Sequence, residues 1–89
     1  MDQRILVGTG RPYIEEGEIR TFTDNVDEKE LVWHRDYEDR IIEPLQETDW
    51  KFQYDNNTPE TLKRLFIRRG VYHRLIKGTG NLKLKVIKL

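Results

Sequence analysis

The residues best suited to chemistry in this sequence are two histidines and an aspartate. His34 and Asp36 stand two positions apart, and His73 follows Gly70 by three residues. In a strand, residues two apart point to the same face and lie about 7 Å apart, so one metal ion could reach both. If the two segments pair, two imidazoles and one carboxylate converge. Such a triad suits Fe(II) and leaves coordination positions open for a substrate and oxygen.

The same residues also have a purely structural interpretation. His34 and Asp36 could form a hydrogen-bonded pair on a charged strand, with Asp39 and Arg40 continuing a surface ion-pair network. His73 could be a core histidine whose ring nitrogens are satisfied by its neighbours. The spacing alone leaves both interpretations open.

Composition excludes some classes of site and partner. The chain has no cysteine, which rules out disulfides and thiolate metal sites. Its 16 basic residues balance its 16 acidic residues, and neither this balance nor any recognition motif favours nucleic-acid binding. Residues 63–89 contain Lys and Arg but no Asp or Glu. This basic third either lines a site for an anionic ligand or offsets the acid-rich segment 24–55.

Length and hydropathy predict a single domain, residues 1–89, with residues 1–16 as its N-terminal arm. No apolar run approaches the roughly 20 residues that a membrane-spanning helix needs, so no membrane association is expected. The start of the chain, Met1-Asp2-Gln3-Arg4, lacks the pattern of a signal peptide. We therefore expect a cytoplasmic protein. Because a chain this short has a thin core, burial against a second copy would stabilise it, and a homodimer is expected.

The elements that must position the candidate site are short strands. Turn residues recur every eight to twelve positions, which is typical of an all-β sandwich or barrel. Alternating apolar and polar residues predict strands at 18–23, 30–37, 49–54, 62–67, 72–77 and 81–89.

Several details follow from these patterns. Trp50, Phe52 and Tyr54 share one face of their strand. In the last strand, three apolar residues alternate with lysines, and we expect Lys83, Lys85 and Lys88 to protect a sheet edge from aggregation.

The turns and the N-terminal arm carry expectations of their own. Gly78-Thr79-Gly80 is expected to be a hairpin turn with both glycines at positive φ. A helix over 58–66, capped by Thr58, competes with the strand there. An edge strand over 1–7 and a loop over 8–12 are expected in the N-terminal arm.

The order of these features resembles the two motifs of the small single-domain cupins, over roughly residues 18–89. In the first motif, His-x-His followed by Glu, His34 matches the first histidine and Asp36 takes the place of the second. In the second motif, Pro-x-Gly-x-x-His, Gly70 and His73 match. The chain also resembles the short cupin-like proteins of tailed bacteriophages, although no particular residue isolates that group. The resemblance implies a small cupin-like barrel, that is, a double-stranded β-helix or jelly roll.

Two positions depart from the cupin motifs. Arg40 stands where the glutamate ligand would be, and a guanidinium cannot ligate a metal because it stays protonated. Arg68 replaces the proline of the second motif. The four-ligand cupin site is therefore absent, and only a three-ligand version remains.

The resemblance implies a divalent metal (Fe, Mn, Ni or Zn) held by His34, Asp36 and His73. Arg40, Tyr72 and Trp50 would then contact a small anionic ligand, although aromatic residues in small barrels are usually core. Two alternatives stay open: a metal-free barrel that binds an anion through Arg40 and the histidines, and a structural or interaction protein that uses its outer surface. The sequence does not decide whether the protein is an enzyme.

Overall fold

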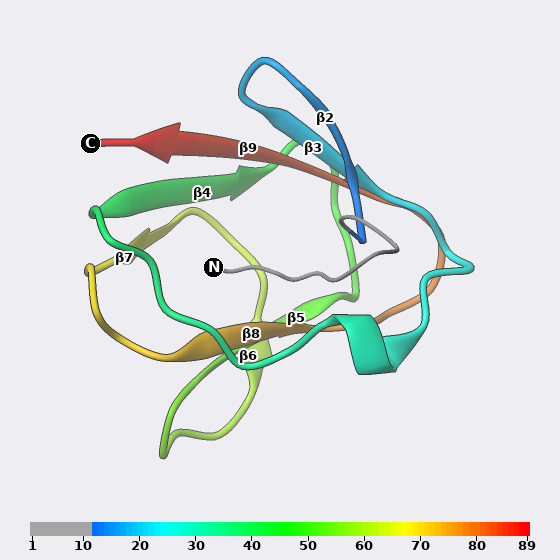
Figure 1. Cartoon of the computed structure of the whole chain (residues 1–89). Coiled ribbons are helices and arrows are strands. Elements are labelled where there is room, and N and C mark those ends of the chain that lie inside the picture. Colours follow the sequence, from blue (N-terminus) through cyan, green and yellow to red (C-terminus); the bar gives the residue numbers. More distant parts are fainter. Residues whose placement is uncertain (1–11) are drawn as a thin grey trace.

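The computed structural model describes residues 12–89, which form two antiparallel β-sheets with no α-helix among them (Figure 1). One single-turn 3-10 helix, η1 (Glu28–Glu30), lies between the strands that end at Phe22 and begin at Arg40. The prediction of an all-β chain is confirmed. In chain order the strands are β2 (Ile14–Glu16), β3 (Ile19–Phe22), β4 (Arg40–Pro44), β5 (Lys51–Tyr54), β6 (Glu60–Thr61), β7 (Leu65–Ile67), β8 (His73–Ile76) and β9 (Leu82–Lys88).

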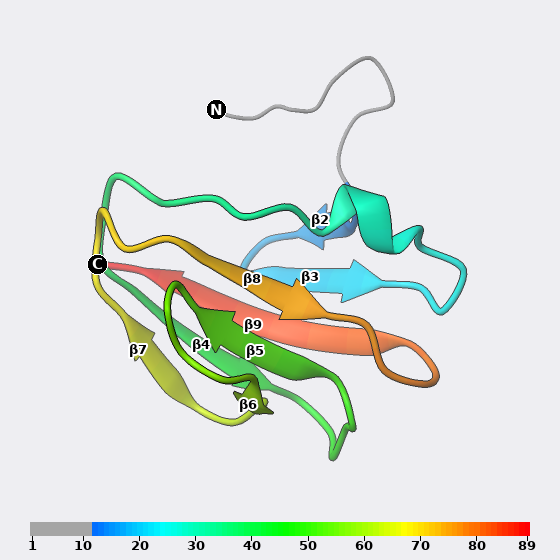
Figure 2. The same ribbon diagram turned by 90° about the horizontal axis from the view of Figure 1, so that it is seen from below.

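The two sheets stack face to face. The larger has the strand order β2-β3-β9-β4-β7, and the smaller has the order β6-β5-β8. Figure 2 shows the smaller sheet lying across the larger one. Among the described strands, chain neighbours often belong to different sheets, so the chain crosses repeatedly between the layers.

Strand β9 is the central strand of the larger sheet, and its alternating apolar and polar residues face opposite sides of that sheet. Leu82, Leu84 and Val86 are buried in the core, whereas Lys83 is exposed. Because β9 pairs with β3 on one side and β4 on the other, it is not an edge strand. The expectation that its lysines protect a sheet edge is therefore wrong, and they instead keep the outer face of a central strand polar.

The core lies between the sheets and receives side chains from both. Trp50 and Phe52 are the most buried, with exposed fractions of 0% and 1%. The Trp50 ring lies 5.9 Å from the ring of Phe22 on the opposite sheet. The remaining members of the core cluster are Val26, Leu31, Ile42, Leu62, Ile67, Leu82, Leu84 and Val86.

The segment predicted as a strand over 30–37 is different in the structure. Asp27 caps η1 by accepting a hydrogen bond from the Lys29 amide at 2.9 Å, so the chain turns where the strand was expected to start. Beyond this turn, one isolated antiparallel bridge, between His34 and His73, joins the segment to β8.

The alternative of a helix over 58–66 does not occur. Strands β6 and β7 occupy that stretch, and the Leu62 amide donates to the Trp50 carbonyl at 3.3 Å. The prediction of a hairpin turn is wrong. Residues 78–80 are not a hairpin turn, because they connect β8 to β9 in the other sheet. The edge strand expected over 1–7 lies outside the described residues, as does most of the loop expected over 8–12.

The glycines of this connection serve different purposes. Gly80 has the expected positive φ of +72°. Gly78 does not; instead, a β-carbon there would lie 2.6 Å from the Trp50 amide nitrogen and 2.8 Å from the Asp49 carbonyl carbon. Gly78 is therefore required because two backbone segments approach closely.

Candidate metal centre

The candidate centre forms where residues 34–39 run beside β8. The amide of His34 donates to the His73 carbonyl at 3.0 Å, and the amide of His73 donates back at 2.9 Å. Further along, the Gly70 amide donates to the Asp36 carbonyl, and the Arg69 amide donates to Asp39 Oδ1, both at 2.9 Å. These bonds fix residues 34–39 against residues 69–73, of which only His73 belongs to a regular strand.

This pairing brings the three predicted ligands together. His34, Asp36 and His73 each offer one ligand atom, and these atoms all lie within 4.8 Å of one another. The two imidazole rings meet edge to face, with centroids 4.4 Å apart. Asp36 Oδ2 lies 3.4 Å from His73 Nε2, the spacing of two ligands about 2.1 Å from a tetrahedral ion.

In both histidines the same ring nitrogen contacts a backbone carbonyl. His34 Nδ1 lies 3.0 Å from the Val32 carbonyl oxygen, and His73 Nδ1 lies 2.9 Å from that of Val71. A carbonyl only accepts hydrogen bonds, so in each ring Nδ1 carries the donated proton. The neutral ring then has a free lone pair on Nε2, which is the usual preparation of a metal-binding histidine.

Asp36 divides its two carboxylate oxygens between different neighbours. Oδ1 lies 3.3 Å from Nη1 of Arg40. Oδ2 is buried and has no hydrogen-bond partner among the described residues. It lies 3.4 Å from His73 Nε2, a contact that is an ion pair when His73 is protonated. If His73 is neutral, the lone pairs of Oδ2 and Nε2 face each other. Only a positive charge makes that contact favourable, either a proton on Nε2 or a shared cation.

The electrostatic surroundings keep Asp36 ionised. Burial alone would raise the pKa of this carboxyl group, but contacts with His73 and Arg40 outweigh burial and hold the pKa below its ordinary value. Asp36 is therefore an anionic ligand at neutral pH.

His34 is held in the neutral form that ligates metals. Desolvation of its imidazole by the surrounding protein, and then the proximity of His73, lower its pKa. The residue as a whole is nevertheless exposed, whereas Asp36 and His73 are buried.

Phe52 and Glu38 support the centre, although the sequence did not mark them as site residues. Phe52 stacks on His73 with ring centroids 5.5 Å apart and fixes that ring against the core. Glu38 Oε2 accepts from Nε of Arg40 at 2.7 Å. The only sequence signals were the aromatic stripe containing Phe52 and the spacing of Glu38 two residues before Arg40.

Three residues were expected to contact a small anionic ligand, and the structure places them in different surroundings. Arg40 directs its guanidinium at Asp36 and Glu38. Trp50 is fully buried in the core, as the structural interpretation of its aromatic stripe expects, and donates from Nε1 to the Gly80 carbonyl at 3.1 Å. Tyr72 is half-exposed beside Arg35, whose guanidinium carbon lies 5.3 Å from its ring centroid.

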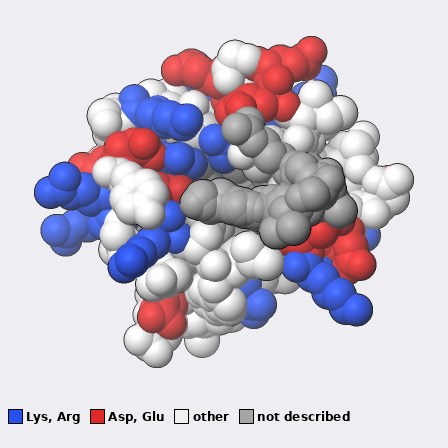
Figure 3. Space-filling view, in the orientation of Figure 1, with Lys and Arg blue, Asp and Glu red and all other residues white. Residues whose placement is uncertain are grey.

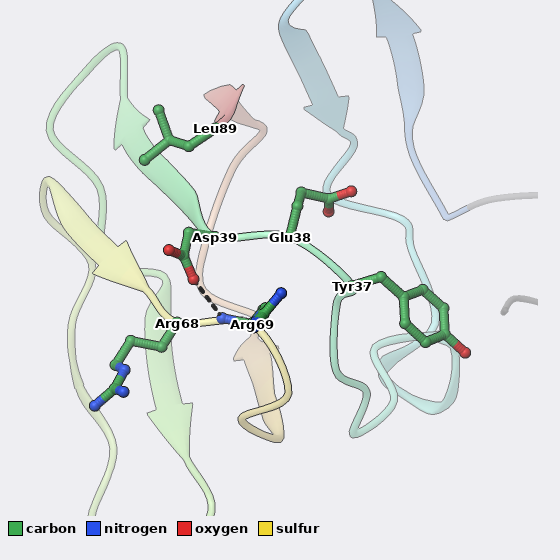
Figure 4. A pocket seen from close by; sticks show the side chains of 6 residues that line it. All are labelled: Tyr37, Glu38, Asp39, Arg68, Arg69 and Leu89. Atoms are coloured by element: carbon green, nitrogen blue, oxygen red, sulfur yellow. Dashed lines mark hydrogen bonds between the residues drawn. The ribbon is translucent and has the colours of Figure 1, made fainter.

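A shallow polar hollow of about 450 Å³ lies near the centre (Figure 4). Its side chains diverge, with Tyr37 and Arg68 pointing away from each other. It does not include the three ligand residues. The lining residues are Tyr37, Glu38, Asp39, Arg68, Arg69 and Leu89.

Fold and site together define a small all-β protein of two antiparallel sheets with a His–Asp–His grouping that could hold a metal ion. No helix among residues 12–89 is long and apolar enough to span a membrane.

The fold is similar to that of a solved bacterial protein. The crystal structure of protein NMB1881 from Neisseria meningitidis matches with a TM-score of 0.56 and 17% sequence identity, covering 96% of this chain and 88% of that one. Identity this low shows a shared fold alone. No family model matches the sequence, and no curated protein matches it.

Proposed function

We propose that this chain is a cupin-like protein that binds a divalent metal ion through Nε2 of His34, Nε2 of His73 and Oδ2 of Asp36. The observation that carries the proposal is the buried, unpartnered Oδ2 facing Nε2 of His73 at 3.4 Å. A cation between these atoms would satisfy both, because each offers only a lone pair when His73 is neutral.

The donor set limits the choice of metal. Two imidazoles and one carboxylate suit Fe(II), Zn²⁺, Mn²⁺ or Ni²⁺, and a set of three protein ligands leaves coordination positions free. A bound ion would supply Lewis acidity or activate a ligand molecule. Since His34 is exposed, a small anion could reach these open positions from solvent.

Arg40 fits this function as a positioning residue. Its contact with Asp36 Oδ1 leaves only Oδ2 for a metal, and Glu38 holds the guanidinium in place. Partners that orient a ligand in this way commonly change metal affinity by about 10–100-fold.

The test is elemental analysis of untagged protein, after purification and again after reconstitution with Fe(II), Mn²⁺, Ni²⁺ or Zn²⁺. We expect near-stoichiometric metal in the wild-type chain and none in the His34→Ala/His73→Ala double variant. Because His73 is buried, the single variant His34→Gln is needed as well, with circular dichroism confirming that it folds. Glu47→Gln, at an exposed position, is the matched control and should keep the metal.

A metal-free binding barrel is the second candidate. It is favoured by Arg40, which already places a positive charge 3.3 Å from Asp36 Oδ1. If the wild-type chain takes up no metal even after reconstitution, the metal proposal is wrong and this candidate gains support.

A further inference from the structure

Two of the three candidate ligand residues belong to the long connection between β3 and β4, residues 23–39. This connection contains no regular strand, and its only secondary structure is η1 and the bridge from His34 to His73. Connections longer than about 15 residues are uncommon in compact domains and commonly have a function of their own. Figure 2 shows the part after η1 as a plain trace alongside β8.

The first half of the connection is anchored in the core. Val26 and Leu31 are buried among the apolar side chains. The Lys77 ammonium donates to the Val26 carbonyl at 3.0 Å. The Asp24 amide donates to Oδ1 of Asn81 at 2.8 Å. Apolar burial and hydrogen bonds therefore hold this half together.

The second half, residues 32–39, is named here the ligand segment, and it has no buried apolar side chain. Its one buried residue is Asp36, whereas Val32, Trp33 and Tyr37 are all exposed. Figure 3 shows charged side chains of both signs over the end of the molecule where the ligand segment runs into β4. The ligand segment therefore lies against β8 without the apolar burial that gives most segments of a domain their local stability.

Hydrogen bonds and one stacked pair attach the ligand segment to its neighbours. His34 and His73 exchange two backbone hydrogen bonds, and the Asp36 carbonyl accepts a third from the turn before β8. The guanidinium carbon of Arg74 lies 4.6 Å from the ring centroid of Trp33. Few contacts of this kind, close to solvent, allow a segment to open while the rest of the domain stays folded.

The carboxylate of Asp36 makes this attachment depend on a cation. Its Oδ2 is buried with no hydrogen-bond partner among the described residues, so docking the segment removes a charged oxygen from water without replacing its hydrogen bonds. A cation between Oδ2 and Nε2 of His73 would replace them. Because His34 and Asp36 come from the ligand segment and His73 from β8, the same ion would also cross-link the two.

Building on the metal site proposed above, we propose that a bound divalent ion acts as a clip for the ligand segment. With the ion the segment is docked against β8, and without it the segment opens locally while the two sheets stay folded. The ion replaces the apolar anchor that residues 32–39 lack. Because Trp33 belongs to the segment, the ion also controls whether its ring stays against Arg74.

The test is amide hydrogen exchange, resolved by residue with NMR on the full chain, with and without Zn²⁺. The amides of His34, Gly70 and His73 donate across the junction and report its opening. Without metal we expect them to exchange at least about tenfold faster than the Val86 amide, which is bonded within the larger sheet. At free Zn²⁺ of about 100 times the dissociation constant, they should slow by about a hundredfold, because opening then requires release of the ion.

Three controls make this result specific. The Thr79 amide, bonded to Asp49 Oδ1 in the connection between β8 and β9, should not slow, because its opening leaves the ion bound. In the variant His34→Gln, changed at an exposed position, Zn²⁺ should slow the Gly70 amide far less. Glu47→Gln should respond like the wild type.

Proteolysis gives a second measurement. Trypsin cleaves after Arg35, between His34 and Asp36, only when the ligand segment is open, and Zn²⁺ should slow this cut by a similar factor. The cut after Lys63, exposed between β6 and β7, should not slow. Equal protection of the two bonds would contradict a local clip.

Elemental analysis of the same samples separates the two ways in which this proposal can fail. A chain that binds Zn²⁺ while the three junction amides exchange as before keeps the metal site and overturns the clip. Junction amides as slow as Val86 without metal also overturn it, since the segment is then already fastened. A chain that takes up no Zn²⁺ overturns the metal site and the clip together.

Discussion

At the scale of single residues, the candidate site depends on how Asp36 uses its two oxygens. Arg40 takes Oδ1, and Oδ2 is left buried against an imidazole nitrogen. The sequence indicated these residues but not this division. From the sequence, Arg40 was expected to contact an anionic ligand. In the folded chain its guanidinium instead forms ion pairs with Asp36 and Glu38.

His34 makes folding stability depend on pH. Desolvation and then the proximity of His73 lower its pKa, so the unfolded chain binds this proton more readily than the folded chain. Stability then rises with pH between the two pKa values. We expect the metal-free protein to lose stability as the pH falls below about 6.5, the ordinary histidine value. Asp36, whose pKa is also lowered, adds its own loss only below about pH 4.

Urea unfolding in the presence of a chelator, followed from about pH 7.5 to pH 5, measures this dependence. The variant His34→Gln should show a shallower slope over that interval. An unchanged slope would mean that another group titrates there.

At the scale of elements, the site is built from one regular strand and one irregular segment. Strand β8 supplies His73, and backbone hydrogen bonds tie His34 to His73 and Asp36 to Gly70, in the turn before β8. The sequence predicted a strand over 30–37 from alternation alone, but the cap at Asp27 and the turn η1 prevented it. The three candidate ligand residues still lie together. A single antiparallel bridge places His34 opposite His73, just as a full pair of strands would.

The connection between β8 and β9 should be intolerant of substitution at Gly78. A β-carbon there would collide with backbone atoms of Asp49 and Trp50 and with the Asp49 side chain. We expect Gly78→Ala to lower the free energy of unfolding by about 2–3 kcal/mol. Gly80→Ala should lower it by only about 1 kcal/mol, the strain of a positive φ. Equal urea midpoints for the two variants would contradict this account.

At the scale of the whole molecule, the two sheets share one thin core. The two tryptophans differ sharply in how far that core buries them. Trp50 is fully buried between the sheets, whereas Trp33 is 40% exposed and lies beneath the guanidinium of Arg74. The same residue type therefore has a stabilising role in one place and a surface role in the other.

Replacing each tryptophan with phenylalanine tests this difference. Trp50→Phe leaves a gap in the core and an unpaired Gly80 carbonyl, and should lower the free energy of unfolding by about 2–3 kcal/mol. Trp33→Phe should change it by less than about 0.5 kcal/mol. Both are measured by chemical denaturation at low protein concentration, so that any dimer is dissociated. A comparable loss of stability in the two variants would contradict the placing of Trp50 in the core and of Trp33 at the surface.

The sequence by itself determined the all-β class, the inward stripes of β5 and β9, and the identity of the three clustered residues. These depend on period-two alternation and on the scarcity of histidine, which are local properties of the chain. Only the tertiary structure decided that β9 is central and that residues 78–80 cross between sheets. Sheet order and burial depend on pairings between residues far apart in the chain. Alternation within one strand distinguishes its apolar face from its polar face, but it does not identify the neighbouring strand or the surface that each face packs against.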